Sequence, residues 1–365
     1  MARGKAVVAM SGGVDSSVAA ALLVEAGYDV TGIMLKLWRG DEINHSSGCC
    51  SVGAADDARR VADVLGIPFY VLNFADRFED SVVADFKAAY SAGRTPNPCV
   101  RCNQWIKFDA LLEKATALGA DILATGHYAR VEQRGDGYRL LRGADVRKDQ
   151  SYVLWMLTQD QLARARFPVG NMEKSETRAI ATSLGLRTAR KPDSQEICFV
   201  RNGDFDAYVD EHLSDATAPG PILDTSGAVL GRHRGIGRYT VGQRKGLGIS
   251  LGEPAFVTAI DADRNALTVG PRADLAVGGL VCDETSFTGR GPGDGDAVLI
   301  QHRAHGGVHP GLVGAITADR FEIGYDSPVA AVAPGQSAAL YSADSPDELL
   351  GGGVIAATLP VGADV

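Results

Sequence analysis

The sequence predicts an α/β N-terminal domain built on a parallel sheet, then a small mixed central domain and a C-terminal β-barrel. Three observations lead to this fold class. Over the first 200 residues, short apolar runs alternate with amphipathic stretches, which is typical of βαβ units. The next 70 or so residues are rich in glycine and basic side chains. From residue 274 onward, short strand patterns are separated by Gly, Pro and Asp turns.

The chain of 365 residues is too long for one ordinary core. We therefore expect three domains, over residues 1–200, 201–273 and 274–365. Four apolar runs in the first domain are predicted as strands, over residues 6–9, 30–35, 69–72 and 122–125. Four amphipathic stretches are predicted as helices, over residues 14–26, 52–65, 78–90 and 108–118. Ligands of such sheets lie beyond the carboxyl ends of the strands, so a site is expected there.

The later elements are shorter. One helix is predicted over residues 205–212, and barrel strands are predicted over residues 297–301, 312–318 and 337–341. A last strand is expected in the tail that begins with the glycines 351–353. We find no internal repeat.

Composition limits the class of protein. Hydrophobic residues make up 45% and charged residues 22% of the chain, and no apolar run is long enough to span a membrane. We therefore expect a cytoplasmic protein that does not bind membranes. Six cysteines without a signal peptide indicate reduced thiols used for chemistry or metal binding, not a disulfide framework. The net charge of −9 argues against indiscriminate nucleic-acid binding.

The segment from Met10 to Ser17 (MSGGVDSS) directly follows the first predicted strand and precedes the first predicted helix. Gly12 and Gly13 allow main-chain N–H groups to approach an anion, and the helix N-terminus favours negative charge there. No lysine follows the glycines, so this is not the loop that grips β- and γ-phosphates through a lysine. The pattern instead resembles that of ATP pyrophosphatases, which cleave ATP between the α- and β-phosphates.

Thiols occur in two further segments. Two prolines precede Cys99 and Cys102 in residues 94–103 (RTPNPCVRCN), which predicts a stiff loop that presents both thiols. An isolated C-x-x-C could be half of a zinc site, but no second C-x-x-C completes it. Cys198 follows a polar, turn-prone approach at 192–195, which favours a mobile functional loop over a buried small side chain.

A basic stretch lies between Gly231 and Gly252. It contains no carboxylate, and its cations are Arg232, Arg234, Arg238, Arg244 and Lys245. Either a solvated charged surface or a contact to a polyanion would explain this stretch.

Seven segments occur together and in this order: 11–16 (SGGVDS), 93–98 (GRTPNP), 102–103 (CN), 124–128 (ATGHY), 148–152 (KDQSY), 193–199 (DSQEICF) and 240–246 (TVGQRKG). With them, the chain resembles the bacterial tRNA-specific 2-thiouridylase family over nearly its entire length. The resemblance implies a Rossmann-like N-terminal domain of the adenine nucleotide alpha hydrolase type.

The resemblance also implies a reaction. ATP, with Mg²⁺, adenylates the C2 oxygen of the wobble uridine in tRNAs for Lys, Glu and Gln, and sulfur then replaces that oxygen. The sulfur donor is a persulfide on Cys198, with Cys102 as its partner nucleophile. Cys102 could free hydrosulfide from this persulfide, or it could cleave the S–S bond after the persulfide has attacked. Both routes end in a Cys102–Cys198 disulfide that must be reduced.

Binding residues follow from the same resemblance. The ATP-site positions are Ala9, Met10, Ser11, Gly12, Gly13, Val14, Asp15, Ser16, Leu35 and Gly126. The positions beside the target base or the tRNA are Asn97, Pro98, Cys99, His127, Lys148, Asp149, Gln150, Arg234, Arg244, Lys245, Gln301, His302 and Gln336. Cys99 stands where some members carry Asp, a proposed acid/base group, and residues 301–303 (QHR) replace a more basic tRNA contact. We also expect a monomer that receives sulfur from a cysteine desulfurase or from a relay carrier protein.

Three alternatives remain at this stage. Cys99, Cys102 and Cys198 could hold a [4Fe–4S] cluster with one open iron that binds hydrosulfide. The chain could be an amide-forming or amination ATP pyrophosphatase, which would not need paired thiols. It could also be a tRNA-binding module that has lost catalysis, although the intact phosphate loop and both cysteines argue against this.

Overall fold

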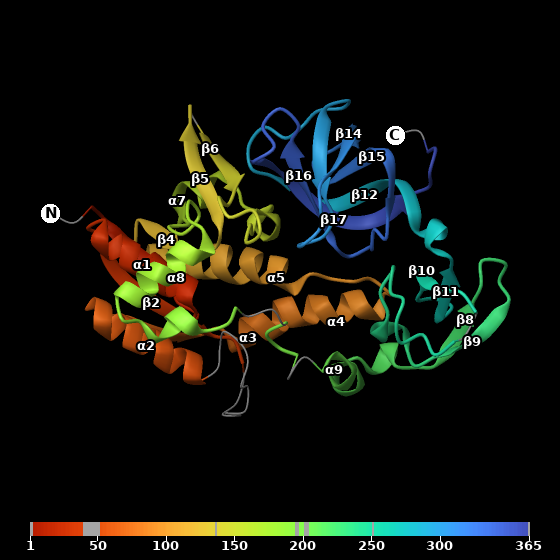
Figure 1. Ribbon diagram of the computed structural model, residues 1–365, viewed down its shortest axis with the longest axis horizontal. Helices are drawn as coiled ribbons and strands as arrows, with labels where there is room; N and C mark the ends of the chain where they lie inside the picture. Colours follow the sequence, from red (N-terminus) through yellow and green to blue (C-terminus); the bar gives the residue numbers. More distant parts are fainter. Residues whose placement is uncertain are drawn as a thin grey trace. The chain divides into compact units, whose positions relative to one another are not determined.

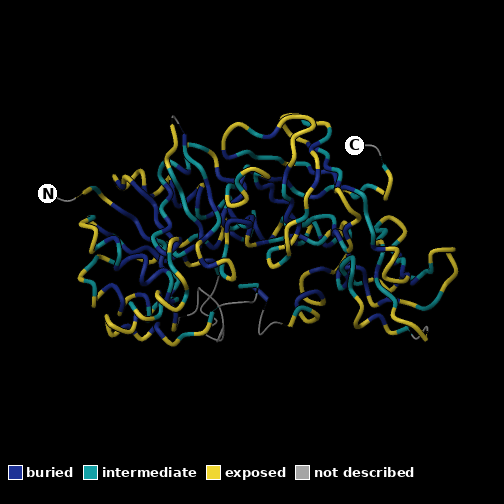
Figure 2. The backbone as a smooth tube through the Cα atoms, turned by 45° about the horizontal axis from the view of Figure 1, so that its top comes forward, coloured by how far each residue is buried: buried dark blue, intermediate teal, exposed yellow. Residues whose placement is uncertain are grey.

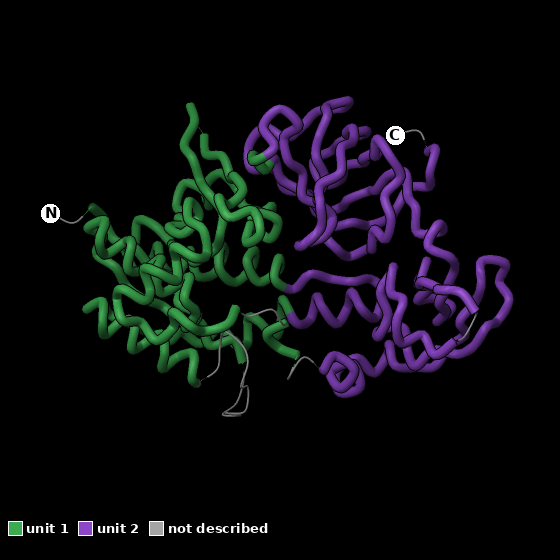
Figure 3. Tube along the Cα trace, in the orientation of Figure 1, with its two compact units in different colours: residues 1–82, 99–203, 347–349 green, residues 83–98, 204–346, 350–365 purple. Residues whose placement is uncertain are grey.

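The computed structural model describes residues 3–38, 52–135, 137–193, 197–200, 204–249 and 252–363. The chain divides into two compact units, which Figure 3 shows in two colours. Unit 1 comprises residues 1–82, 99–203 and 347–349, and unit 2 comprises residues 83–98, 204–346 and 350–365. No sequence signal indicated that residues 83–98 group with the later part of the chain.

Unit 1 is built on a five-stranded parallel sheet, as the sequence predicted. Its strand order is β3-β2-β1-β4-β7. The strands are β1 (Lys5–Ala9), β2 (Asp29–Lys36), β3 (Phe69–Asn73), β4 (Ile122–Ala124) and β7 (Ala165–Arg166). The four predicted strands are confirmed to within one residue at each end, because each is a short apolar run bounded by polar residues. Strand β7 was missed, since two residues carry no pattern.

Helices cover this sheet (Figure 1). Contacts join α1 (Val14–Glu25) to β1 and β2, α2 (Val52–Leu65) to β2 and β3, and α8 (Lys174–Ser183) to α1. Their shared core contains the buried side chains of Val8, Val18, Val61 and Ala181. Figure 2 colours the backbone by burial. Strands β1 and β4 are mostly buried, which fits strands covered on both faces.

The remaining helical segments of unit 1 are short. They are α3 (Ala75–Phe78), α5 (Pro98–Arg101), the wide-turned π-helix η2 (Cys102–Leu111), α6 (Leu112–Ala117), η3 (Ser151–Leu154), α7 (Gln159–Arg164) and η4 (Arg187–Arg190). The π-helix η1 (Glu79–Val83) continues the chain after α3 and leads into α4 (Ala84–Ser91), which belongs to unit 2. The helix expected over residues 78–90 is therefore confirmed, although it changes its hydrogen-bonding pattern along its length.

One antiparallel hairpin in unit 1 was not predicted. It consists of β5 (Ala129–Arg134) and β6 (Gly137–Arg142). Residues 347–349 join unit 1 here, because Glu348 and Leu349 pair with Leu141 and Leu140 of β6. A partner more than 200 residues away leaves no trace in the local sequence.

Unit 2 contains a four-stranded sheet and a barrel. The sheet order is β10 (Phe256–Asp261), β11 (Ala266–Gly270), β8 (Gly220–Leu223) and β9 (Val229–His233). Short helices accompany it: α9 (Phe205–His212), as predicted, with η6 (Ser214–Ala216), η7 (Ile236–Arg238) and η8 (Arg272–Leu275).

The barrel has six strands and closes through a pairing of β12 with β17. In order around the barrel, they are β12 (Ala276–Phe287), β15 (Arg320–Ala330), β14 (His309–Ile316), β13 (Ala297–Gln301), β16 (Ser337–Ser342) and β17 (Glu348–Leu359). Its core holds Leu280, Ile300, Phe321 and Ile355. The predicted C-terminal barrel is confirmed. Among the described residues, no helix combines the length and the apolar composition that crossing a membrane requires.

Candidate active site

The phosphate loop lies between β1 and α1, as the sequence predicted. Gly12 has φ +70°, and a Cβ atom there would lie 2.2 Å from the carbonyl oxygen of Ala54. Only glycine therefore fits. The Ser11 N–H donates to Ser16 Oγ at 3.2 Å, and the Ser17 hydroxyl donates to the Gly13 carbonyl at 2.8 Å. These bonds fix the loop at the start of a helix, where an anion is favoured.

The one carboxylate of the loop is neutralised from outside it. Lys174, at the start of α8, places its Nζ 2.8 Å from both carboxylate oxygens of Asp15. The Tyr128 hydroxyl also donates to Asp15 at 2.9 Å. Burial of the phenol, together with the neighbouring Asp15 charge, raises the pKa of Tyr128. Asp15 thus keeps its position while its charge opposes phosphate less.

The other positions predicted to bind ATP gather at the same edge of the sheet. Ala9 ends β1, Leu35 lies near the end of β2, and Gly126 follows β4. Carboxyl ends of parallel strands meet at one edge, so the structure brings these residues together. Gly126 packs directly on the loop, because a Cβ atom there would lie 2.6 Å from the backbone nitrogen of Ser16.

The C-x-x-C segment departs from the prediction of a stiff loop. Cys99 lies in α5, which begins at Pro98, and Cys102 begins η2. The loop prediction is wrong because proline is well suited to the first helical position, where its missing N–H costs nothing. The helix therefore begins ten residues before the expected start at Phe108. Cys99 is exposed and Cys102 is half-buried, and both are thiols.

The two neighbours of Cys102 in sequence, Arg101 and Asn103, are held by contacts of their side chains. The Arg101 guanidinium lies 4.7 Å from the centre of the Trp105 ring and donates to Gln104. The buried Asn103 side chain donates to the Val153 carbonyl and accepts from Lys107, both at 2.9 Å. Arg101 is the nearest cation to Cys102 in sequence and is itself buried.

Cys198 is a half-buried thiol of the same unit. Its neighbour Phe199 packs against the rings of Trp38 and Phe78, each with a centroid separation of 6.0 Å. Residues 194–196 and the Cys49–Cys50 pair lie outside the described residues. Cys282 is buried in the barrel core, where burial raises the pKa of its thiol well above the usual value.

The three candidate ligands of an iron–sulfur cluster do not form a metal-binding group. Across the parts of the chain that the structure describes, no three His, Cys, Asp or Glu side chains gather as metal ligands would. Cys99, Cys102 and Cys198 are all among those residues, so their arrangement here does not fit such a cluster.

Asp193 connects the segment before Cys198 to the phosphate loop. The sequence placed this residue in a recognised segment but gave it no role of its own. It accepts from Lys148 and Lys174, both at 2.7 Å, and from Arg178 at 3.2 Å. Burial alone would raise the pKa of Asp193, but these cations outweigh it and lower the pKa. Asp193 stands five residues before Cys198, so it joins the approach to the thiol to the loop carboxylate through Lys174.

Two residues of the 148–150 loop, which were expected to contact tRNA, form hydrogen bonds within the protein. The Asp149 carboxylate accepts from Arg142 at 2.7 Å and from the N–H groups of Gly143 and Ser151. The exposed Gln150 accepts from the Tyr128 N–H at 3.0 Å. Lys148 is the cation of this loop.

His127 is buried between the rings of Phe108 and Phe167. Its Nδ1 lies 2.6 Å from the Thr125 hydroxyl. Burial, helped by the charge of Lys107, lowers the pKa of His127 well below the usual range. The ring is therefore neutral, which favours a packing role for it in this structure.

Three further positions predicted to contact tRNA lie in unit 2, two of them buried and Gln336 half-buried. Gln301 and His302 are buried, and the Gln301 amide donates to the carbonyls of Arg303 and Ala304. Gln336 donates to the carbonyl of Thr95 at 2.8 Å, so it holds the segment that leads to Asn97 and Pro98.

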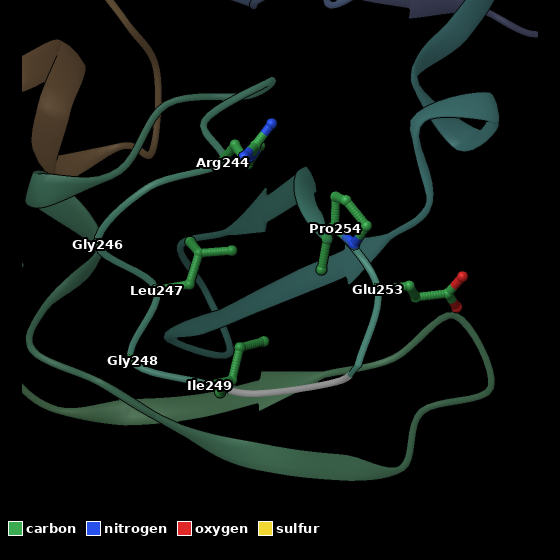
Figure 4. Close-up of a pocket in the computed structure, with 8 residues that line it drawn as sticks. Arg244, Gly246, Leu247, Gly248, Ile249, Glu253 and Pro254 are labelled. Carbon is green, nitrogen blue, oxygen red and sulfur yellow. The ribbon is translucent and has the colours of Figure 1, made fainter.

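Two arginines of the basic stretch form ion pairs with carboxylates of α9. Arg234 lies 3.1 Å from Asp206, and Arg238 binds both Asp206 and Asp210. Arg244 and Lys245 are exposed. Arg244, Leu247, Ile249 and Pro254 line a pocket of about 240 Å³, while the Glu253 carboxylate points away (Figure 4).

Comparisons with known proteins cover nearly the whole chain. Three domain families match: a tRNA methyl transferase HUP domain over residues 4–202, a tRNA methyl transferase PRC-barrel domain over 206–271, and an aminomethyltransferase beta-barrel domain over 278–355. Among solved structures, a 4-thiouridine synthetase–RNA complex with bound ATP shares 17% identity at a TM-score of 0.37, over 58% of this chain and 51% of that chain.

The sequence relatives are much more similar. The tRNA-specific 2-thiouridylase MnmA of Geobacter metallireducens is 47% identical and covers 99% of both chains. Its counterpart from Moorella thermoacetica is 49% identical over 96% of this chain and 98% of its own. The Mycolicibacterium smegmatis protein of the same name is 50% identical over 93% and 96%. This chain therefore belongs to the tRNA-specific 2-thiouridylase family.

Proposed function

We propose that this protein is an ATP-dependent tRNA sulfurtransferase that converts the wobble uridine of tRNAs for Lys, Glu and Gln to 2-thiouridine. The observation that carries the proposal is the presence in one compact unit of the phosphate loop, Cys102 and Cys198, in a chain that belongs to this family. ATP alone would explain the loop. The two thiols explain why ATP would activate C2 of uridine, because a sulfur nucleophile needs an activated carbon to attack.

The reaction balances in two steps. The C2 oxygen of uridine attacks the α-phosphorus of ATP, and pyrophosphate leaves. Sulfur from the Cys198 persulfide then bonds to C2, and the C2–O bond breaks to release AMP. Cys102 cleaves the persulfide S–S bond either before or after the sulfur bonds to C2. Both orders leave a Cys102–Cys198 disulfide, which a reductant must reopen.

The chain's own residues have distinct tasks in this proposal. The loop N–H groups and the N-terminus of α1 bind the phosphates, and the nucleotide's Mg²⁺ shields their charge. Leu35 offers an apolar contact to adenine. Gly126 allows the backbone after β4 to approach the loop closely. The half-buried Cys102 is the partner nucleophile.

The side chains proposed to contact tRNA differ in how exposed they are. Arg244 and Lys245 are exposed, and Lys148 is half-exposed, so these cations can reach phosphates. Asn97, Pro98 and Cys99 are proposed to lie beside the target base. Gln301, His302 and Asp149 are engaged inside the protein, so any effect they have on tRNA would be indirect.

We further propose the domain boundaries near residues 200 and 273, a monomeric protein and a cytoplasmic location. A cysteine desulfurase or a relay carrier would load Cys198 with sulfur. These assignments rest on the family and on the residue patterns.

Replacement of Cys198 by alanine tests the function. Cys198→Ala should bind tRNA and release pyrophosphate but form no thiouridine, measured by mass spectrometry of wobble nucleosides after incubation with ATP-Mg²⁺ and a sulfur source. Cys282→Ala is the matched control, because that thiol is buried in the barrel core, and it should retain activity. Normal 2-thiouridine from Cys198→Ala would refute the assignment.

An iron–sulfur mechanism gives a different outcome in a parallel experiment. Metal-free protein, checked for iron and labile sulfide after anaerobic purification, should turn over fully if the persulfide carries the sulfur. Turnover that requires iron would instead favour a cluster on Cys99, Cys102 and Cys198.

A further inference from the structure

The phosphate loop contains no lysine, yet the structure brings one to it from far along the chain. Lys191 follows η4, 179 residues after Gly12 in sequence, and its Nζ lies 3.0 Å from the Gly12 carbonyl oxygen. The same Nζ lies 2.8 Å from Oδ2 of Asp57 in α2. A cation thus stands at the glycine turn where an anion is expected to bind.

The backbone of Lys191 is fixed where it can serve this loop. The Arg178 guanidinium donates to the Lys191 carbonyl at 3.0 Å, and the Lys191 N–H donates to Thr188 at 3.0 Å. The Thr188 hydroxyl in turn lies 3.3 Å from the hydroxyl of Ser17 in α1. The segment that carries Lys191 is therefore tied to the helix that begins at the loop.

We propose that Lys191 binds the β- and γ-phosphates of ATP, as the lysine within a loop does in other phosphate sites. The assignment rests on the proposed function, which makes ATP the ligand of the loop. An ammonium group has three N–H donors, and two of them are directed to Gly12 and Asp57 among the described residues. The side chain is 35% exposed, so a ligand can reach the third.

Lys174 is the other lysine near the loop, but it has a different task. Its three contacts to Asp15 and Asp193 use all of its N–H donors, and its side chain is only 11% exposed. Lys174 is a positioning residue for Asp15. The two lysines therefore divide the work, one holding the loop and one meeting the ligand.

Asp57 makes the assignment testable. If Lys191 is simply half of an ion pair that holds α2 to the loop, loss of either partner should have the same effect. If Lys191 binds phosphate, Asp57 competes with the ligand for the same ammonium group. Removing the Asp57 charge should then leave ATP binding unchanged or strengthen it, whereas removing the Lys191 charge should weaken it.

The experiment compares Lys191→Met, Lys191→Arg and Asp57→Asn with the unaltered protein by equilibrium binding of ATP-Mg²⁺, pyrophosphate and AMP. Lys191→Met should raise the Kd for ATP and pyrophosphate about 10- to 100-fold, the usual loss for a hydrogen bond to a charged group. The Kd for AMP should change less than about threefold, because AMP lacks the β- and γ-phosphates. Lys191→Arg should recover part of the affinity, and Asp57→Asn should bind ATP at least as well as the unaltered protein.

Two outcomes would overturn the proposal. One is unchanged ATP affinity in Lys191→Met, and the other is an equal loss of affinity in Lys191→Met and Asp57→Asn. Thermal unfolding of each variant separates loss of fold from loss of binding, and Lys191→Gln replaces Lys191→Met should the latter fail to fold. Absence of ATP binding by the unaltered protein would instead refute the proposed function itself.

Discussion

Asp15 illustrates how a carboxylate can lie inside a phosphate site. Two cation-derived hydrogen bonds from Lys174 and one from the Tyr128 hydroxyl satisfy its oxygens. An unpaired carboxylate would repel the triphosphate, whereas a paired one can act as a fixed part of the loop. None of this could be predicted from the loop sequence, because Lys174 is 159 residues away and no spacing rule connects the two.

Gly126 gives the first prediction at the scale of single residues. Gly126→Ala should place a Cβ atom 2.6 Å from the Ser16 nitrogen and 2.7 Å from the Asp15 carbonyl carbon, both backbone atoms that cannot move without distorting the loop. We expect about 1–3 kcal/mol of destabilisation and at least a tenfold weaker affinity for ATP. Chemical denaturation and equilibrium ATP binding measure the two effects.

The control for this change is Gly307→Ala. Gly307 lies in an exposed loop of unit 2, and a Cβ atom there would meet nothing within 4 Å. Stability and ATP affinity should both stay at the level of the unaltered protein. Unchanged ATP affinity in Gly126→Ala would show that the loop tolerates displacement.

At the scale of elements, the sequence predicted the strands of the parallel sheet but not the helix that begins at Pro98. The strands of the parallel sheet were predicted closely, because apolar runs between polar boundaries carry a strong local signal. The two prolines before Cys99 were interpreted as a loop, although proline is also suited to a helix start. Choosing between these meanings required the tertiary contacts that hold Asn103 and Arg101.

The barrel strands give a second prediction. Strands β13, β14 and β15 bring His302, just after β13, to His309 and Tyr325, with the two imidazoles stacked at 5.2 Å. Burial, followed by the charges of His309 and Arg303, lowers the pKa of His302 to about 4. In the unfolded chain the value returns to about 6.5. The unfolded state therefore takes up a proton first as the pH falls.

It follows that the barrel loses stability as the pH falls from about 6.5 to about 4, by up to about 3 kcal/mol from this residue. The loss is complete below the folded pKa, where both states are protonated. His302→Gln removes the titrating group, so the free energy of unfolding of the variant should fall less over this range. Denaturation curves at several pH values measure the difference, and parallel curves for the two proteins would contradict it.

At the scale of the whole molecule, the net charge of the chain differs in sign from that of its basic stretch. The net charge is −9, yet the chain belongs to a family whose named members act on tRNA. Asp206 and Asp210 pair with Arg234 and Arg238, which removes part of the basic character that the sequence indicated. Arg244 and Lys245 remain exposed beside the pocket of unit 2. The sequence identified the basic stretch but could not show which of its cations pair with carboxylates.

The pairing of Arg234 gives the last prediction. Arg244→Ala should weaken tRNA binding and reduce the slope of log affinity against log salt by about one, since one phosphate contact releases about one counterion. Arg234→Ala, in the same unit, should have a smaller effect, because Arg234 would first have to leave its ion pair with Asp206. Titrations of tRNA between low and moderate salt measure both quantities. An unchanged affinity and slope in Arg244→Ala would show that this side chain faces solvent in the complex, and a larger effect in Arg234→Ala would place the tRNA on the face of α9.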